Sequence, residues 1–360
     1  HAIQATVAAR PIHARHPASG IRNLLTHSET FDPAATSWYL GGSGNPTYSL
    51  VNGEQRVSWS NGKGNVIQQP AAEPAAGETW TVRFRVKVID LGGAGASDFD
   101  LSIRSGDQAE EINQPITVVD DGAWHDYTAS ITFSAPSGFG SYVHFRHTGS
   151  ASPVIAFQNA QLEVGTAASA YQKVTTRYDI TETGQRDIHY LYFDGVDDFL
   201  SAGDVLDLGA SDRTAAFGVR VTGTDRGSFL SKRGSGTPGS HPGWGVRSDA
   251  QRLMLEYDDG AAGTIAPIGD AGGLADRAVH VAEIGFGTEA RSYRNGALSP
   301  STADLSALGD STGYKAFHIG GKHFHAETLF YGAVVREGLL TGTGRAKLET
   351  FLAQRTGVTP

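Results

Sequence analysis

The length, composition and charge of the chain limit the kind of protein it can be. It has 360 residues, enough for two or three domains, and its 46 glycines are nearly twice the usual share of about 7%, as in turn-rich all-β proteins. With 29 basic and 38 acidic side chains the net charge is -9, which argues against nucleic acid as a partner. The sequence has no cysteine, which excludes disulfides, thiolate metal sites and cysteine nucleophiles.

The start of the chain lacks a regular pattern. Residues 1–22 carry prolines, histidines and arginines with neither helical nor alternating periodicity, so we expect an extended lead-in. The single methionine is Met254, and we therefore expect this lead-in to be the end of a missing upstream region. No stretch is apolar and long enough for a membrane helix, and we expect no membrane insertion.

Residues 23–165 are predicted to form a β-sandwich. Residues 80–89 alternate apolar and polar side chains, which indicates a half-buried antiparallel strand. Further short strands separated by turns are predicted at residues 99–103, 116–119, 124–133, 142–145 and 154–164. This spacing is typical of a sandwich, and the small polar residues 166–177 that follow are predicted to be a linker.

Residues 178–360 are predicted to form a second sandwich. Residues 190–200 run from an aromatic strand through the Asp194-Gly195 turn into an apolar strand, which is a hairpin pattern. Asp259-Gly260 and Asn295-Gly296 are further hairpin dipeptides. The sequence therefore predicts an all-β protein with two jelly-roll β-sandwiches in series.

One helix is predicted near the C-terminus. Residues 341–357 show a helical period that places Leu348, Phe351 and Leu352 on one stripe. Gly357 stands where a helix C-cap is expected, because glycine adopts the left-handed conformation there.

Several ordered signatures resemble known families. The second half resembles laminin-G-like or concanavalin A-like jelly rolls through residues 193–199 (FDGVDDF), 244–247 (WGVR), 293–296 (YRNG) and 318–321 (HIGG). Residues 23–31 (NLLTHSETF) and 160–165 (AQLEVG) resemble the two ends of a carbohydrate-binding-module-like jelly roll common in phage structural proteins. Together the arrangement is similar to tail-fibre, spike or adhesin proteins of tailed phages and of phage-derived gene transfer agents.

This resemblance implies a location and partners. A protein of this kind is expected on the virion surface after assembly in the bacterial cytoplasm, beside other virion proteins, as a homo-oligomer or in multiple copies. Its expected role is host attachment through recognition of bacterial surface or capsular polysaccharide, with weak single sites strengthened by multivalency.

Sugar binding needs aromatic faces beside amides, carboxylates or arginines, because sugar rings stack on π surfaces while their hydroxyls need hydrogen bonds. The candidate glycan-binding residues on this basis are Trp38, Tyr39, Trp59, Asn61, Trp244, Arg247 and Asp258. The alternative for the tryptophans is a place in the core, because tryptophan is usually largely buried.

A metal site is a further alternative, and no other cofactor is expected. Asp194 and Asp197 offer hard oxygens to calcium, an ion frequent in laminin-G-like domains, to which this region is similar. The competing interpretation is that Asp194 caps the turn and that its neighbour faces water, since aspartate is common in turns.

Paired carboxylates test for an enzyme. Glu110 and Glu111 are adjacent, so in a strand they point to opposite faces, while Asp98 and Asp100 flank a phenylalanine in a glycine-rich region. Neither pair matches the carboxylates of glycoside hydrolases on concanavalin A-like folds. We therefore expect a protein that is not an enzyme, with a polysaccharide depolymerase and a structural virion assembly or decoration module as the alternatives.

Overall fold

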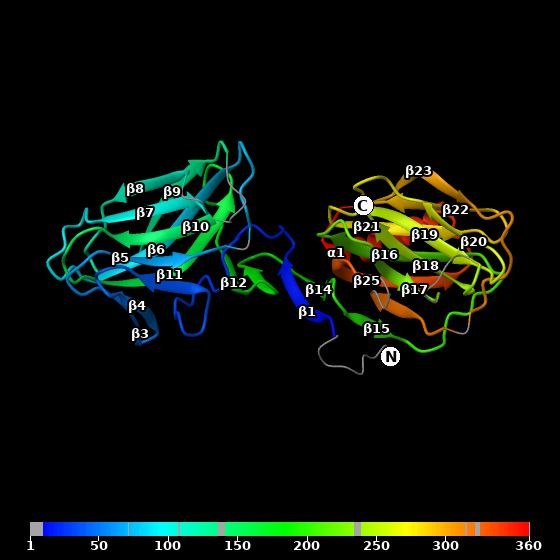
Figure 1. The fold of residues 1–360 in the computed structure, drawn as a ribbon, viewed down its shortest axis with the longest axis horizontal. Coiled ribbons are helices and arrows are strands. Elements are labelled where there is room, and N and C mark those ends of the chain that lie inside the picture. The colour runs from blue at the N-terminus through cyan, green and yellow to red at the C-terminus, as the bar shows by residue number, and fades with distance from the viewer. Residues whose placement is uncertain are drawn as a thin grey trace. The chain divides into compact units, whose positions relative to one another are not determined.

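The computed structural model describes residues 10–70, 72–106, 109–135, 141–233, 239–313, 315–320 and 325–359. It divides into two compact units: the first unit is Ser19–Asp187, and the second unit is His1–Ala18 together with Ile188–Pro360. The described residues form many antiparallel strands and one helix near the C-terminus (Figure 1), which confirms the predicted all-β class. Within the described residues, no helix is long and apolar enough to cross a membrane.

The first unit contains two five-stranded antiparallel sheets. The β10 sheet has the order β2 (Trp38–Gly41), β5 (Gly64–Gln68), β10 (Ser141–His147), β7 (Phe99–Ser105), β8 (Glu111–Ile116). The β11 sheet has the order β3 (Thr47–Val51), β4 (Glu54–Ser58), β11 (Val154–Val164), β6 (Thr79–Asp90), β9 (His125–Thr132). Figure 1 shows these strands in the blue to green part of the chain.

Alternation along the strands explains why the two sheets enclose a core. In β6 the side chains of Trp80, Val82 and Phe84 are buried, while Arg83 and Arg85 between them are partly exposed. Aromatic rings from both sheets meet in the interior, where Phe145 of β10 lies 4.9 Å from Phe157 of β11, centroid to centroid. The predicted strand at residues 80–89 is confirmed, because a period of two buries one face of a strand.

The first unit also contains a short hairpin, β12 (Gln172–Thr176) with β13 (Asp179–Glu182). The expected linker at residues 166–177 thus includes a strand. Gln172 is fully buried, and its side-chain oxygen accepts hydrogen bonds from the backbone N–H groups of Arg22 at 2.7 Å and Asn23 at 3.2 Å. These bonds tie the segment to the start of the first unit.

The second unit is built from two further antiparallel sheets. One contains, in order, β1 (Ile12–Pro17), β14 (Asp187–Asp194), β25 (Glu327–Glu337), β16 (Arg213–Val221), β21 (Ala278–Ile284), β22 (Glu289–Arg294), β23 (Ala297–Asp304). The other has the order β15 (Phe199–Ser201), β24 (His318–Gly320), β17 (Gly227–Ser231), β18 (Gly243–Asp249), β19 (Arg252–Asp258), β20 (Gly263–Pro267). Part of the expected lead-in is therefore the strand β1.

The helix α1 (Gly342–Thr356) lies where the sequence predicts it. Gly357 adopts a left-handed φ of 68° at the C-cap, and its N–H donates to the carbonyl of Ala353 at 2.8 Å. Leu352 is buried, but Phe351 is 44% exposed, so its predicted place on the buried stripe is wrong. The reason is geometric: successive helical residues are about 100° apart, and only one of these two neighbours can face the sheet.

Candidate functional site

The structure decides between the two interpretations of the first-unit tryptophans in favour of the core. Trp38 and Trp59 are each 2% exposed. Trp38 packs 4.6 Å from Phe31, centroid to centroid, and its ring N–H donates to the carbonyl of His27 at 3.0 Å. Neither ring offers a face on which a sugar could stack, which corrects their assignment as binding residues.

The three candidates of the second unit are also buried. Trp244 is 1% exposed, and Arg247 lies with its Nε 3.2 Å from Oε1 of Glu256. Asp258 is inaccessible, and it accepts hydrogen bonds from the backbone N–H groups of Gly239 and Gly260, both at 2.8 Å. Buried charges need such partners, so this group stabilises the sandwich instead of facing a ligand.

Of the predicted glycan-binding residues, Tyr39 and Asn61 are the two that the structure leaves exposed. Asn61 lies in a turn with a positive φ of 49°, and its Oδ1 accepts a hydrogen bond from Ser152 Oγ at 3.2 Å. Tyr39 stands on β2 and is 63% exposed. Because Trp38 before it points into the core, Tyr39 points to the opposite side of the β10 sheet.

We call that side the outer face of the β10 sheet. The strand register aligns one row of side chains across the sheet, which consists of Tyr39, Ile67, His144, Ser102 and Asn113. Directly paired residues of antiparallel strands point to the same side and interact, so these five residues share the face. The neighbouring positions along β10, Val143 and Phe145, are buried in the core.

Two more rows flank this one on the same face. On one side Tyr142 pairs with Arg104, which pairs with Glu111. On the other side Arg146 of β10 pairs with Asn65 of β5 and Asp100 of β7. The outer face therefore gathers two tyrosines, two arginines, a histidine, amides and two carboxylates, a composition suited to sugar rings and hydroxyls.

The carboxylates of the outer face are held by one arginine. Arg146 Nε lies 3.4 Å from Asp100 Oδ1, and Arg146 Nη1 lies 3.5 Å from Glu111 Oε1. Ser102 Oγ also donates to Glu111 Oε1 at 3.1 Å. Burial raises the pKa of Asp100, and the charge of Arg146 opposes that rise.

His144 stands in the middle of the face, with ring nitrogens that have no hydrogen-bond partner in the described part of the chain. It is 4% exposed, and neither of its ring nitrogens makes a hydrogen bond within the described residues. Burial lowers the pKa of His144 to about 3, helped by Arg104 and Arg146. The ring is therefore neutral at physiological pH, with one nitrogen that donates and one that accepts.

Arg104 is the second group with unused hydrogen-bonding capacity. Its guanidinium carbon lies 5.0 Å from the centroid of the Tyr142 ring. Within the described residues, the guanidinium group makes no hydrogen bond or ion pair. Buried polar groups in folded proteins are nearly all hydrogen-bonded, since leaving one unpaired costs about 1–3 kcal/mol. Arg104 and His144 thus mark where a polar ligand or water would complete the face.

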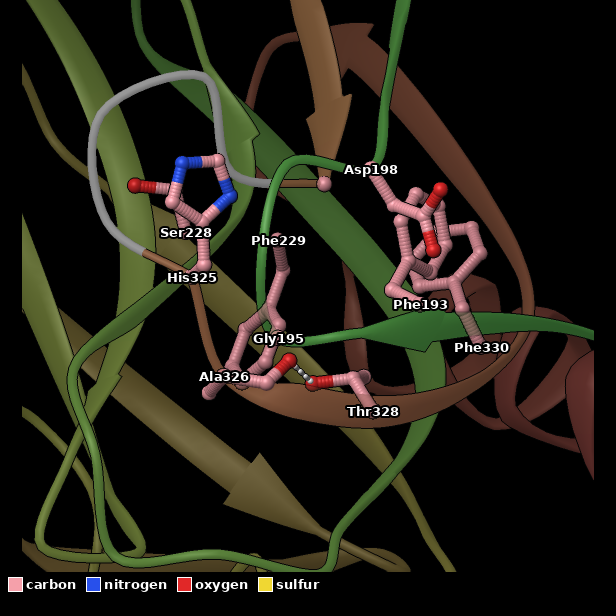
Figure 2. Close-up of a pocket in the computed structure, with 10 residues that line it drawn as sticks. Phe193, Gly195, Asp198, Ser228, Phe229, His325, Ala326, Thr328 and Phe330 are labelled. Atoms are coloured by element: carbon pink, nitrogen blue, oxygen red, sulfur yellow. Dashed lines mark hydrogen bonds between the residues drawn. The ribbon is translucent and has the colours of Figure 1, made fainter. Parts of the chain in front are cut away.

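The acidic turn of the second unit offers a cluster of oxygens. Carboxylate oxygens of Asp194, Asp197 and Asp198 lie within 4.8 Å of one another. Asp198 is buried beside Phe193 and Phe330 in a small pocket (Figure 2), and it accepts the backbone N–H of Asp194 at 2.8 Å. Asp194 Oδ1 accepts the N–H of Val196 at 2.8 Å.

These contacts show what the turn does with its carboxylates. Two of the three accept hydrogen bonds from the backbone of the turn itself, as expected for turn-forming aspartates. Calcium takes about six to eight oxygen ligands, of which the three side chains would supply a part. Calcium binding therefore stays the untested alternative to the turn-forming role of these aspartates.

No family model matches the sequence, and no curated protein matches it. Part of the chain is similar to the enzymatically active domain of bacteriophage CBA120 tailspike protein 4, with 14% identity and a TM-score of 0.30 over 40% of this chain and 21% of that one. The ligand binding domain of botulinum neurotoxin serotype D, in complex with N-acetylneuraminic acid, is similar with 8% identity and a TM-score of 0.37 over 45% of this chain and 42% of that one. A CBM4 structure is similar with 15% identity and a TM-score of 0.28 over 36% of this chain and 86% of that one.

The chain thus spans less than half of the length of the tailspike and neurotoxin structures. All three TM-scores are below 0.5.

Proposed function

We propose that this chain is a virion-associated receptor-binding protein that recognises bacterial surface or capsular polysaccharide through the outer face of the β10 sheet. The observation that carries the proposal is His144, which is buried among polar side chains with both ring nitrogens unpaired. A glycan hydroxyl is both a donor and an acceptor, so it can accept from Arg104 and donate to the neutral imidazole once the side chains that cover the ring nitrogens move aside.

The rings of the face supply the other half of sugar recognition. Tyr39 presents an exposed ring at one end of the central row, and Tyr142 lies beside His144 at 6.3 Å, centroid to centroid. Stacking on such rings gives affinity with little lost side-chain entropy. The assignment to a virion rests on the ordered sequence signatures shared with phage adhesins.

We further propose that the face binds without cleaving. A glycosidase needs one carboxyl group protonated as an acid and a second one ionised. Asp100 and Glu111 both lie against Arg146, and the charge of Arg146 opposes protonation of Asp100. A depolymerase remains the alternative outcome, since burial raises the pKa of Asp100.

The test is retention of purified capsular polysaccharides, from a panel of bacterial strains, on the immobilised full chain, together with an assay for new reducing ends. We expect retention without cleavage, and about tenfold weaker retention by Arg104→Ala. Arg226→Ala in the second unit is the matched control, because Arg226 pairs there with Asp249 at 3.0 Å. New reducing ends would show a depolymerase, and no retention by any polysaccharide would favour an assembly module.

A further inference from the structure

A groove lies in the first unit, on the β11 sheet. It encloses about 760 Å³, partly open to solvent, and its lining includes Trp124, Glu29, Asn52, Glu54, Gln158 and Asn159. Asn52 belongs to the β3–β4 turn, Trp124 directly precedes β9, and Gln158 stands where the pairing of β11 with β6 shifts register. The groove is therefore built near the end of the sheet, where these three segments meet the loop that carries Glu29.

Trp124 gives the groove an aromatic wall. Its side chain is partly buried, unlike the tryptophans of the core. Lys87 Nζ lies 5.5 Å from the centroid of the Trp124 ring, but Lys87 is not among the residues that line the groove. The Trp124 ring thus contacts this cation and also contributes to the lining of the groove.

The acidic side chains of the groove are already neutralised. Glu54 is bonded to Lys87 and to Arg56, whose Nη2 lies 2.6 Å from its Oε2, and these contacts lower the pKa of Glu54. Glu29 Oε2 lies 2.6 Å from Lys173 Nζ. A charged ligand would lose hydration here without gaining an unpaired counter-charge.

Three of the four amides that line the groove have unused hydrogen-bonding capacity, whereas the fourth, Gln55, is bonded to Phe31, Tyr48 and Glu29. Within the described residues, the side chains of Asn52, Gln158 and Asn159 make no hydrogen bond, although each amide can donate two and accept two. Asn52 and Asn159 both have a positive φ of 53°, so each is fixed at a tight bend of the backbone. Neutral amides beside an aromatic ring match the hydroxyls and the apolar face of a sugar.

We propose that this groove is a second saccharide site that takes a neutral oligosaccharide. It lies on the sheet opposite the outer face of the β10 sheet, shares no residue with it, and does not depend on the function proposed for that face. Two sugar sites in one unit would let a single copy of the chain engage a polysaccharide twice, which raises avidity without any new contact.

The proposal is tested by ¹⁹F NMR of the full chain labelled with 5-fluorotryptophan, with the Trp124 resonance assigned from Trp124→Phe. The probes are cellohexaose, xylohexaose, mannohexaose and maltohexaose, with hexagalacturonate as the charged comparison, each at up to about 10 mM to cover weak sites. We expect at least one neutral probe to shift the Trp124 resonance saturably. Gln158→Ala should weaken that binding about threefold or more, with Arg226→Ala in the second unit as the unaffected control, since Arg226 pairs there with Asp249 at 3.0 Å.

Three results would overturn the proposal. These are no shift with any neutral probe, tighter binding of hexagalacturonate than of every neutral probe, or affinity unchanged in both Gln158→Ala and Asn159→Ala. Loss of binding in Arg104→Ala would instead place the sugar on the outer face of the β10 sheet. Failure of this groove is thereby distinguished from failure of that face.

Discussion

The ring of Tyr39 lies directly over Gly41, two residues further along β2. A Cβ added to Gly41 would come within 2.7 Å of Tyr39 Cε1, so the position of the ring depends on the missing side chain. The ring nevertheless stays 63% exposed. Gly41 thus fixes an aromatic platform at one end of the outer face of the β10 sheet.

Gly41→Ala is expected to weaken polysaccharide binding while leaving the fold intact. The clash falls on the far end of a side chain that can turn away, so the free energy of unfolding should change by less than about 0.5 kcal/mol. The loss of a placed ring should weaken binding about three- to tenfold. Retention assays and urea unfolding measure the two effects. Tyr39→Phe is the control and should leave both binding and stability unchanged. Equal polysaccharide binding by Gly41→Ala and wild type would show that the Tyr39 ring does not serve as a binding platform.

His144→Leu is expected to separate binding from stability. The substitution replaces a buried ring that has two unpaired nitrogens with an apolar side chain, which should stabilise the first unit by about 1 kcal/mol. It should at the same time weaken polysaccharide binding. Hydrogen exchange of the β10 amides reports the stability, and retention reports the binding. Faster exchange in the variant would mean that the imidazole contributes to folding.

The free energy of unfolding should depend on pH because His280 of the second unit is buried. Burial and the nearby Arg294 lower the pKa of His280 to about 3, whereas an unfolded histidine has a pKa near 6.5. Between these values the unfolded chain binds a proton that the folded chain does not, so the free energy of unfolding falls as the pH drops below about 6.5. Above that pH the histidine contributes no dependence.

The expected loss from His280 is about 2 kcal/mol between pH 7 and pH 5. Urea unfolding of the full chain at both pH values measures it, and His280→Leu should lose correspondingly less. Buried His16 and His144, whose pKa values burial lowers to about 4 and about 3, add to the wild-type loss and remain in the variant. An identical pH dependence in wild type and variant would contradict the assignment.

Much of the fold can be predicted from the sequence because local periodicity determines which side of a strand is buried, although the strands β1 and β12 lie in segments expected to be a lead-in and a linker. Alternation along residues 80–89 predicts β6, and the Asn295-Gly296 dipeptide lies at the turn between β22 and β23. The same alternation at residues 142–146 places Tyr142, His144 and Arg146 on one face, a signal available before the structure.

The site could not be predicted in the same way, because it depends on pairing between distant strands. Tyr39 and His144 share a row only through the register of β2, β5 and β10. Trp38 and Trp124 show the second difficulty. Both are tryptophans near strand ends, but one is buried and the other lines a groove, and the sequence around each gives no measure of its exposure.

The acidic turn should respond differently to the loss of each of two aspartates. Asp198 is buried and accepts the N–H of Asp194, so Asp198→Ala should destabilise the second unit by about 1 kcal/mol. Asp197 is exposed and lies among like charges, so Asp197→Ala should leave the melting temperature unchanged or slightly raised.

Because the carboxylates serve the turn, millimolar calcium and a chelator should give the same melting temperature in thermal unfolding of wild type. A calcium-dependent rise that Asp197→Ala abolishes would instead establish a metal site.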